Sequence, residues 1–186
     1  MPTEFERRIR RTVDSFDRSA DAAFSRVRGH KVADSVFYTA SDLGDFSFIW
    51  VALGLARAMK PGPDRKAGGR LVVSAAVESL VVNSVVKSCF KRTRPDQGFD
   101  RPRALRRPRS SSFPSGHATS AFSSAVVLGE DDPLAPLYLL LACVVSLSRV
   151  HVKIHHASDV VAGALLGTVF GVAVRRIFPL SPRGGQ

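Results

Sequence analysis

The chain has 186 residues, which is enough for one domain and hardly two. Lys and Arg number 27 against 16 Asp and Glu, so the formal net charge is +11. A charge this basic points to an anionic partner and does not by itself choose among nucleic acid, a phosphorylated substrate and an anionic membrane surface. The two cysteines, Cys89 and Cys143, have no metal-ligand spacing, so we predict reduced, packed thiols and no disulfide, zinc or iron–sulfur framework.

The N-terminal segment 1–30 has the pattern of an amphipathic helix. Phe5, Ile9, Val13 and Phe16 recur at steps of three or four, with arginines and acids between them. We predict a separate helix that lies on the membrane surface, and packing against another subunit is the alternative. No apolar run of signal-peptide length follows the first ten residues, so no cleaved secretion signal is predicted.

The rest of the chain, 31–178, is rich in long apolar stretches. They cover about 35–58, 70–90, 115–129, 133–149 and 158–176. With their flanks, each approaches the ~20 residues that cross a bilayer as a helix. A soluble bundle is the alternative, but five such helices leave too little amphipathic surface for one. We therefore predict an all-α integral membrane bundle with about five transmembrane helices, followed by a flexible tail, 179–186.

The order of these spans gathers three polar clusters. If the helices alternate in direction, residues 87–95, 114–117 and 149–159 all lie on one side of the membrane. A polar loop rich in Pro and Arg, 91–114, also lies there. Charge-free spans argue against a nucleic-acid partner, so a membrane lipid and an anionic bilayer remain the expected partners.

The first cluster, KSCFKRTRP, is basic. We predict that Lys87, Lys91 and Arg94 share one face of a helix that ends before Pro95. A lysine and an arginine together suit a dianionic phosphate, whereas a plain basic flank at a membrane boundary is the alternative. Asn83, one turn earlier, is placed to orient Lys87. Glu78, inside the same span, either serves the site or pairs with another helix.

The second cluster, SSFPSGHATS, begins a helix. Pro114 is tolerated at a helix start, and Ser115 and Gly116 then present backbone N–H groups to an anion. His117 lies beside this cradle, where it either donates a proton or only makes a structural hydrogen bond.

The third cluster, SRVHVKIHHASD, contains three histidines. Arg149, which follows Ser148, is a further candidate phosphate ligand. His155 and Asp159 are four residues apart, so on a first helical turn the carboxylate can fix the imidazole tautomer and leave the other nitrogen as a nucleophile. We predict that His151 and His156 are bystanders.

Together the clusters resemble the type 2 phosphatidic acid phosphatase superfamily, which also includes vanadium haloperoxidases and class A acid phosphatases. The family signature is K-x6-RP, then PSGH, then SR-x5-H-x3-D. This chain matches it in order and spacing with Lys87, Arg94, Pro95, Pro114, Ser115, Gly116, His117, Ser148, Arg149, His155 and Asp159. Membrane members commonly have six spans, whereas we count five here.

The resemblance implies a mechanism and assigns the residues. His155 would form a phosphohistidine, Asp159 would orient it, and His117 would protonate the leaving group and later activate water. The phosphate oxygens would be held by Lys87, Arg94, Ser115, Gly116 and Arg149, with Asn83, Lys91 and Ser148 in support. No metal and no cofactor are expected.

The resemblance also implies a lipid phosphate as the substrate. Most basic residues outside the spans lie on the side of the motifs, which predicts a multi-pass plasma-membrane protein with a cytoplasmic active site. A biosynthetic step on the inner leaflet follows, and our leading substrate is a polyprenyl-phosphoribose phosphate for cell-wall precursors. A polyprenyl diphosphate, phosphatidate or phosphatidylglycerophosphate are alternatives, as are a haloperoxidase and a non-enzymatic anionic-lipid binder. A homo-oligomer is left open.

Overall fold

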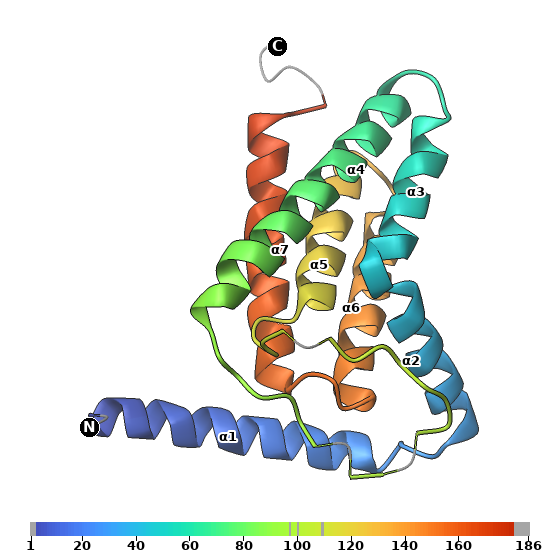
Figure 1. Ribbon diagram of the computed structural model, residues 1–186. Coiled ribbons are helices and arrows are strands. Elements are labelled where there is room, and N and C mark those ends of the chain that lie inside the picture. Colours follow the sequence, from blue (N-terminus) through green and yellow to red (C-terminus); the bar gives the residue numbers. More distant parts are fainter. Residues whose placement is uncertain (1–2, 97, 100, 109, 181–186) are drawn as a thin grey trace.

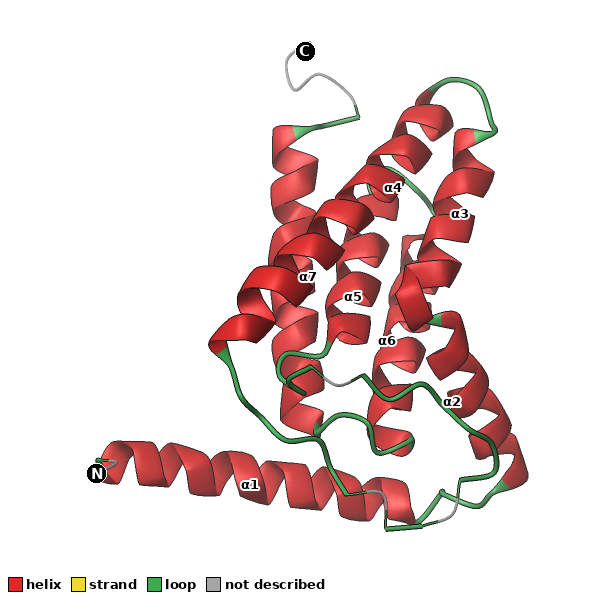
Figure 2. Cartoon of the chain, in the orientation of Figure 1, coloured by secondary structure: helices red, strands yellow, loops and turns green. Residues whose placement is uncertain are grey.

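The computed structural model describes residues 3–96, 98–99, 101–108 and 110–180, and no strand occurs among them. The α-helices are α1 (Glu4–Ser25), α2 (Lys31–Leu43), α3 (Phe48–Ala58), α4 (Pro63–Val81), α5 (Gly116–Leu128), α6 (Ala135–His151) and α7 (Ala157–Ile177). Figure 2 shows them joined only by loops. The all-α prediction is confirmed, while most of the predicted tail, from residue 181 on, lies outside the described residues.

Helix α1 realises the predicted amphipathic segment and lies across one end of the bundle (Figure 1). A capping box starts it, because the Thr3 hydroxyl accepts from the Glu6 N–H and the Glu6 carboxylate accepts from the Thr3 N–H. Phe5 and Phe16 are exposed, so this helix keeps part of its apolar face uncovered.

The predicted span over 35–58 is not one helix. It breaks into α2 and α3 at a short 3₁₀ turn, Asp45–Ser47. Phe46 and Ser47 have φ values of 53° and 58°, and this left-handed backbone cannot continue a right-handed helix. The break matters for the site, since it turns polar groups toward the bundle interior.

Two helices are long and apolar enough to cross a membrane, within the described part of the chain. They are Asp64–Cys89, in which a π turn (Val82–Val86) and a 3₁₀ turn (Lys87–Cys89) extend α4, and Ala157–Ile177. Ala135–His151 is apolar but shorter. The predicted number of about five transmembrane helices goes beyond this finding.

Helix α5 is the centre of the bundle and packs against α4, α6 and α7. Its buried side chains are mostly Ala, Ser and Thr, which lets neighbouring backbones approach closely. On α7, a Cβ at Gly167 would lie 2.2 Å from the carbonyl oxygen of Thr119, so only glycine fits there. The second sequence cluster leads into α5, and the third runs from the end of α6 into the start of α7.

The loop after α4 runs across the same end of the bundle as α1 (Figure 1). The helix ends at Cys89, not beyond Arg94 as predicted, because Phe90 is extended and the following backbone pairs with 111–112. The Ser112 N–H donates to the Arg92 carbonyl at 3.0 Å. Cys89 is free and exposed rather than packed, and Cys143 is free and half-buried.

Candidate active site

The three clusters meet at one end of the bundle, around a cavity of about 360 Å³. The end of α4, the start of α5 and the turn before α7 each contribute a wall. The functional side chains or backbones that line it include Glu78, Lys87, Arg106, Gly116, His117 and His155. Its size lies within the range usual for small-ligand sites.

His155 lies in the tight turn between α6 and α7 and is buried. The carbonyl of Arg149 accepts from the backbone N–H groups of both Ile154 and His155 at 3.1 Å, which fixes this turn. Ring atom Nε2 lies 3.1 Å from Nη1 of Arg94. Because a guanidinium only donates, Nε2 is the acceptor and carries a lone pair, which becomes the nucleophile once a phosphate takes over this Arg94 donor.

Burial lowers the pKa of His155 to about 3, against the opposing effect of Asp159, and the positive charges of Arg149 and Arg94 add to the lowering. The imidazole is therefore neutral at physiological pH, as a nucleophile must be.

Asp159 is fully buried and faces the other ring nitrogen of His155. Its Oδ2 lies 3.6 Å from His155 Nδ1, which is longer than a hydrogen bond. Such contacts often tighten only when substrate is bound. The carboxylate accepts from Arg92 Nη1 at 2.6 Å, from the His156 N–H at 2.9 Å and from Ser112 Oγ at 3.0 Å. These donors keep it ionised and aimed at the ring.

His117, in the first turn of α5, faces the break between α2 and α3. Its Nε2 lies 3.2 Å from Asp45 Oδ1 and 3.2 Å from the Ser41 carbonyl oxygen. A Cβ at Gly44 would lie 2.7 Å from the His117 ring, so the backbone approaches the imidazole closely. No role was predicted for Asp45 from the sequence. The only signal was that two acids, Asp42 and Asp45, interrupt the apolar stretch 35–58.

Two arginines beside His155 have unused donors. Arg149 is buried, and its Nη1 bonds to the Ser41 hydroxyl. Its Nε and Nη2 have no partner among the described residues, and neither has Nε of Arg94. Buried guanidinium donors without partners are unfavourable unless an anion satisfies them. They therefore point to an anionic ligand next to the imidazole.

Lys87 is buried at the end of the extended α4 and lines the cavity together with Glu78. Both were predicted from the sequence as polar groups of one span. The side chain of Asn83 lies outside the part of the chain that the structure describes.

The N-terminus of α5 differs in one respect from the predicted anion cradle. The Ser115 N–H donates to the Asp159 carbonyl at 3.0 Å, and its hydroxyl caps the helix by accepting from the Ala118 N–H. The N–H groups of Gly116 and His117 lie in the first turn, where no carbonyl of the helix is available to them. Gly116 lines the cavity.

Four other predicted residues lie away from the cavity. Lys91 is exposed on the loop, and the Ser148 hydroxyl donates within α6 to the Val145 carbonyl. His151 is buried against aromatic rings, with its Nε2 2.7 Å from Asp34. His156 precedes α7 and offers its backbone N–H to Asp159.

Comparison with known proteins decides the family. A model of the PAP2 superfamily matches residues 67–183. The chain belongs to the PAP2 superfamily. This is the type 2 phosphatidic acid phosphatase family that the three motifs resemble, so that prediction is confirmed. The PAP2 segment contains all three motifs but neither α1 nor the break that provides Asp45.

The relatives are phosphatases. A decaprenylphosphoryl-5-phosphoribose phosphatase of Mycobacterium tuberculosis is 31% identical over 139 residues, which is 72% of this chain and 74% of the relative. An undecaprenyl-diphosphatase of Sulfolobus acidocaldarius is 38% identical over 108 residues, 56% of this chain and 52% of that one. The transmembrane PAP2 type phosphatidylglycerolphosphate phosphatase of Bacillus subtilis has a similar structure, with a TM-score of 0.71, 25% identity and coverage of 94% and 90%. As a member of this family, the 186-residue chain is a membrane-associated lipid phosphate phosphatase.

Proposed function

We propose that the protein hydrolyses a polyprenyl-phosphoribose phosphate through a phosphohistidine on His155. One observation supports this most directly. The neutral Nε2 of His155 lies at a cavity whose neighbouring arginines have unpartnered donors, with His117 on another wall. A phosphate placed there would have a nucleophile on one side and a proton donor within the same cavity.

The reaction has two steps. First, Nε2 of His155 attacks phosphorus, the P–O bond to the sugar breaks, and the imidazolium form of His117 gives a proton to the leaving oxygen and becomes neutral. Then His117 takes a proton from water, the water oxygen attacks phosphorus, and the P–N bond breaks to release phosphate. Phosphoryl transfer needs mainly positioning and neutralisation of oxygen charge. Lys87, Arg94 and Arg149 would supply both, so the proposed reaction requires no metal ion.

The cavity favours a substrate with two phosphates and hydroxyl groups. Arg106 lines it from the polar loop 91–114, and its Cζ lies 4.3 Å from the Phe46 ring centre. It is a further cation that a second phosphate group would use. Glu78 adds a carboxyl group that can accept from sugar hydroxyls, which a polyprenyl diphosphate lacks. The name of the M. tuberculosis relative supports the same choice.

In this proposal the protein crosses the membrane several times. Its three parts are a surface helix (1–30), a membrane phosphatase domain (31–178) and a tail (179–186). Most basic residues outside the predicted spans lie on the side of the three motifs, which supports an active site on the cytoplasmic face. Exposed Cys89 lies on that side, so a membrane-impermeant maleimide should label it only in permeabilised cells. Labelling of intact cells would place the motifs outside.

The substrate is tested by phosphate release from purified protein with a chelator present. The panel contains a polyprenyl-phosphoribose phosphate, undecaprenyl diphosphate, phosphatidate and phosphatidylglycerophosphate. We expect the highest kcat/KM for the first, and no release from any of them by His155→Gln. A preference for the diphosphate would reject the proposed substrate. Vesicle binding without any release would indicate a lipid binder, and vanadate-dependent bromide oxidation a haloperoxidase.

A further inference from the structure

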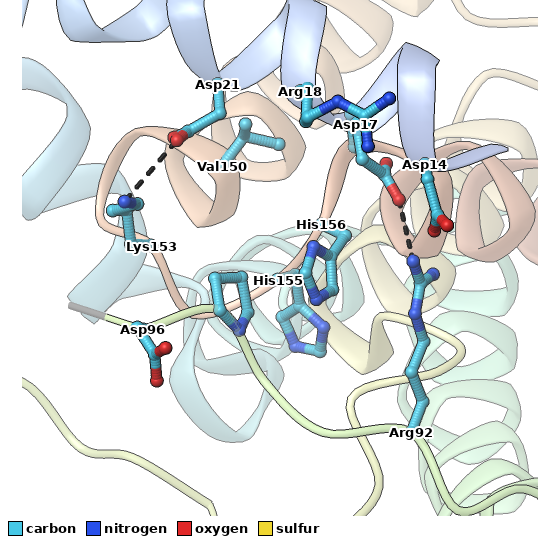
Figure 3. A pocket seen from close by; sticks show the side chains of 12 residues that line it. Asp14, Asp17, Arg18, Asp21, Arg92, Asp96, Val150, Lys153, His155 and His156 are labelled. Carbon is cyan, nitrogen blue, oxygen red and sulfur yellow. Dashed lines mark hydrogen bonds and ion pairs between the residues drawn. The ribbon is translucent and has the colours of Figure 1, made fainter. Parts of the chain in front are cut away.

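Asp17 of α1 is buried, although it belongs to a helix that is otherwise largely exposed. It is 8% exposed, and it is the buried residue that α1 contributes to the described structure. Figure 3 shows its carboxylate pointing from α1 toward Arg92, on a cavity of about 300 Å³ that His155 also lines. A buried carboxylate needs hydrogen-bond partners, and those of Asp17 lead to the active site.

The contacts form a continuous chain. Asp17 Oδ2 accepts from Arg92 Nη2 at 2.6 Å, and the other terminal nitrogen of Arg92, Nη1, donates to Asp159 Oδ1 at 2.6 Å. Asp17 also accepts from the N–H and the hydroxyl of Ser158, both at 2.8 Å. Arg92 therefore bridges two carboxylates, one from α1 and one that faces His155.

This bridge affects the negative charge that Asp159 presents to the imidazole of His155. Asp159 is fully buried, and Arg92 is the cation that contacts it. Because Arg92 also donates to the carboxylate of Asp17, its positive charge is shared between two partners, so Asp159 keeps more negative charge toward His155 Nδ1. The second contact also holds the guanidinium in one orientation.

We propose that Asp17 is a positioning residue for phosphoryl transfer, acting through Arg92 and Asp159 on His155. The inference rests on the proposed nucleophilic role of His155. It extends the active site to α1, which lies outside the PAP2 segment 67–183.

The competing explanation is that Asp17 only anchors α1, and Asp21 is a matched control for it. Asp21 lies one turn later, and its carboxylate contacts Arg28 at 2.6 Å. It also contacts Lys153 at 3.4 Å, a pair that Figure 3 shows. The Lys153 contact joins α1 to the turn between α6 and α7, and Arg28 itself donates to the carbonyls of Val150 and His151 at the end of α6. Within the described part of the chain, no hydrogen bond or ion pair joins Asp21 to Asp159, so the loss of the Asp21 carboxylate tests anchoring alone.

The experiment uses the full-length protein in detergent or nanodiscs. Asp17→Asn should lower kcat and the rate of phosphoenzyme formation about tenfold, with KM within about twofold, because it removes coupling and not substrate binding. Asp21→Asn should lower Tm less than Asp17→Asn, because the Asp21 side chain is 44% exposed, and it should keep kcat within about twofold. Equal losses of kcat in the two variants would overturn the proposal.

Two further variants keep the test decisive if Asp17→Asn does not fold. Arg92→Lys keeps the charge, but a single ammonium cannot reproduce the two directed contacts that Nη1 and Nη2 make with Asp159 and Asp17, so the same loss of kcat is expected. In Asp17→Asn combined with Arg92→Lys, kcat should be no lower than in Arg92→Lys alone. Multiplied losses would show that Asp17 does not act through Arg92. Turnover by His155→Gln would instead reject the proposed function itself.

Discussion

The carboxylate of Asp45 lies 3.2 Å from Nε2 of His117, across the break that separates α2 from α3. The Ser41 carbonyl is at the same distance, so both neighbours of this nitrogen are acceptors and it carries a proton. Each histidine of the site thus has a carboxylate beside it. For His155 the partner is local, at i+4, and for His117 it comes from a different helix pair.

Replacing His117 should make turnover depend on the leaving group. In His117→Gln the first step loses its proton donor, so an alkyl phosphate should react at least about 100-fold more slowly. A p-nitrophenyl phosphate needs no such proton, and it should give a rapid burst of p-nitrophenol followed by slow turnover. Stopped-flow absorbance measures the burst. If the rate of the first step fell equally for both substrates, the assignment of His117 as the general acid would be contradicted.

Replacing His155 and His151 should separate chemistry from packing. His155→Gln should give no phosphoenzyme and no turnover, because the attacking nitrogen is lost. His151→Gln should lower Tm by several degrees, since this buried ring contacts Asp34 and Phe37, but change kcat per folded molecule by no more than about twofold. Acid quench with labelled substrate and thermal unfolding measure the two effects. Comparable loss of kcat in both variants would show that the assignment of the nucleophile is wrong.

The buried neutral state of His155 should make folding stability depend on pH. Its pKa is about 3 in the folded protein and 6.5 ordinarily, so between these values the unfolded chain binds a proton that the folded protein does not. Stability from this group therefore rises with pH through that window and is constant above it. Lowering the pH from about 7.5 to about 5 should reduce Tm more in the wild type than in His155→Gln. Equal reductions would show that His155 is not held neutral.

The contact between α5 and α7 should tolerate no side chain at Gly167. Gly167→Ala places a Cβ 2.2 Å from the Thr119 carbonyl oxygen, so the helices must separate at a cost of about 1–3 kcal/mol. Separation would also move His117 relative to Asp159, and kcat should fall. Gly69→Ala is the matched control, because nothing lies within 4 Å of the added Cβ and the helix should gain about 0.5–1 kcal/mol. The two variants are compared by their free energy of unfolding in denaturant and by kcat. A Gly167→Ala variant with unchanged stability and kcat would contradict the close packing.

The sequence was sufficient for the all-helical class, for most helix extents and for the meeting of the three motifs, because apolar runs mark helices and alternating direction gives a common side. It did not predict the break between α2 and α3 at Asp45–Ser47. It failed where long-range contacts override local pattern. Lys91 and Arg94 fit one helical face with Lys87, yet the backbone of Arg92 pairs with Ser112 instead and ends the helix. Asp17 and Asp45 were not predicted as site residues, because their partners lie far away along the chain and only the tertiary fold brings them together.

The turn that bears His155 is fastened by main-chain bonds to the carbonyl of Arg149, independently of the Arg149 side chain. The backbone of Arg149 thus holds the His155 turn in place, while its side chain is left to bind the substrate. Side chains around the cavity can diversify toward other headgroups while the imidazole stays where it is. The relatives of this chain are named for lipids as different as a phosphoribose and a diphosphate, and a framework of this kind would allow such a change of headgroup.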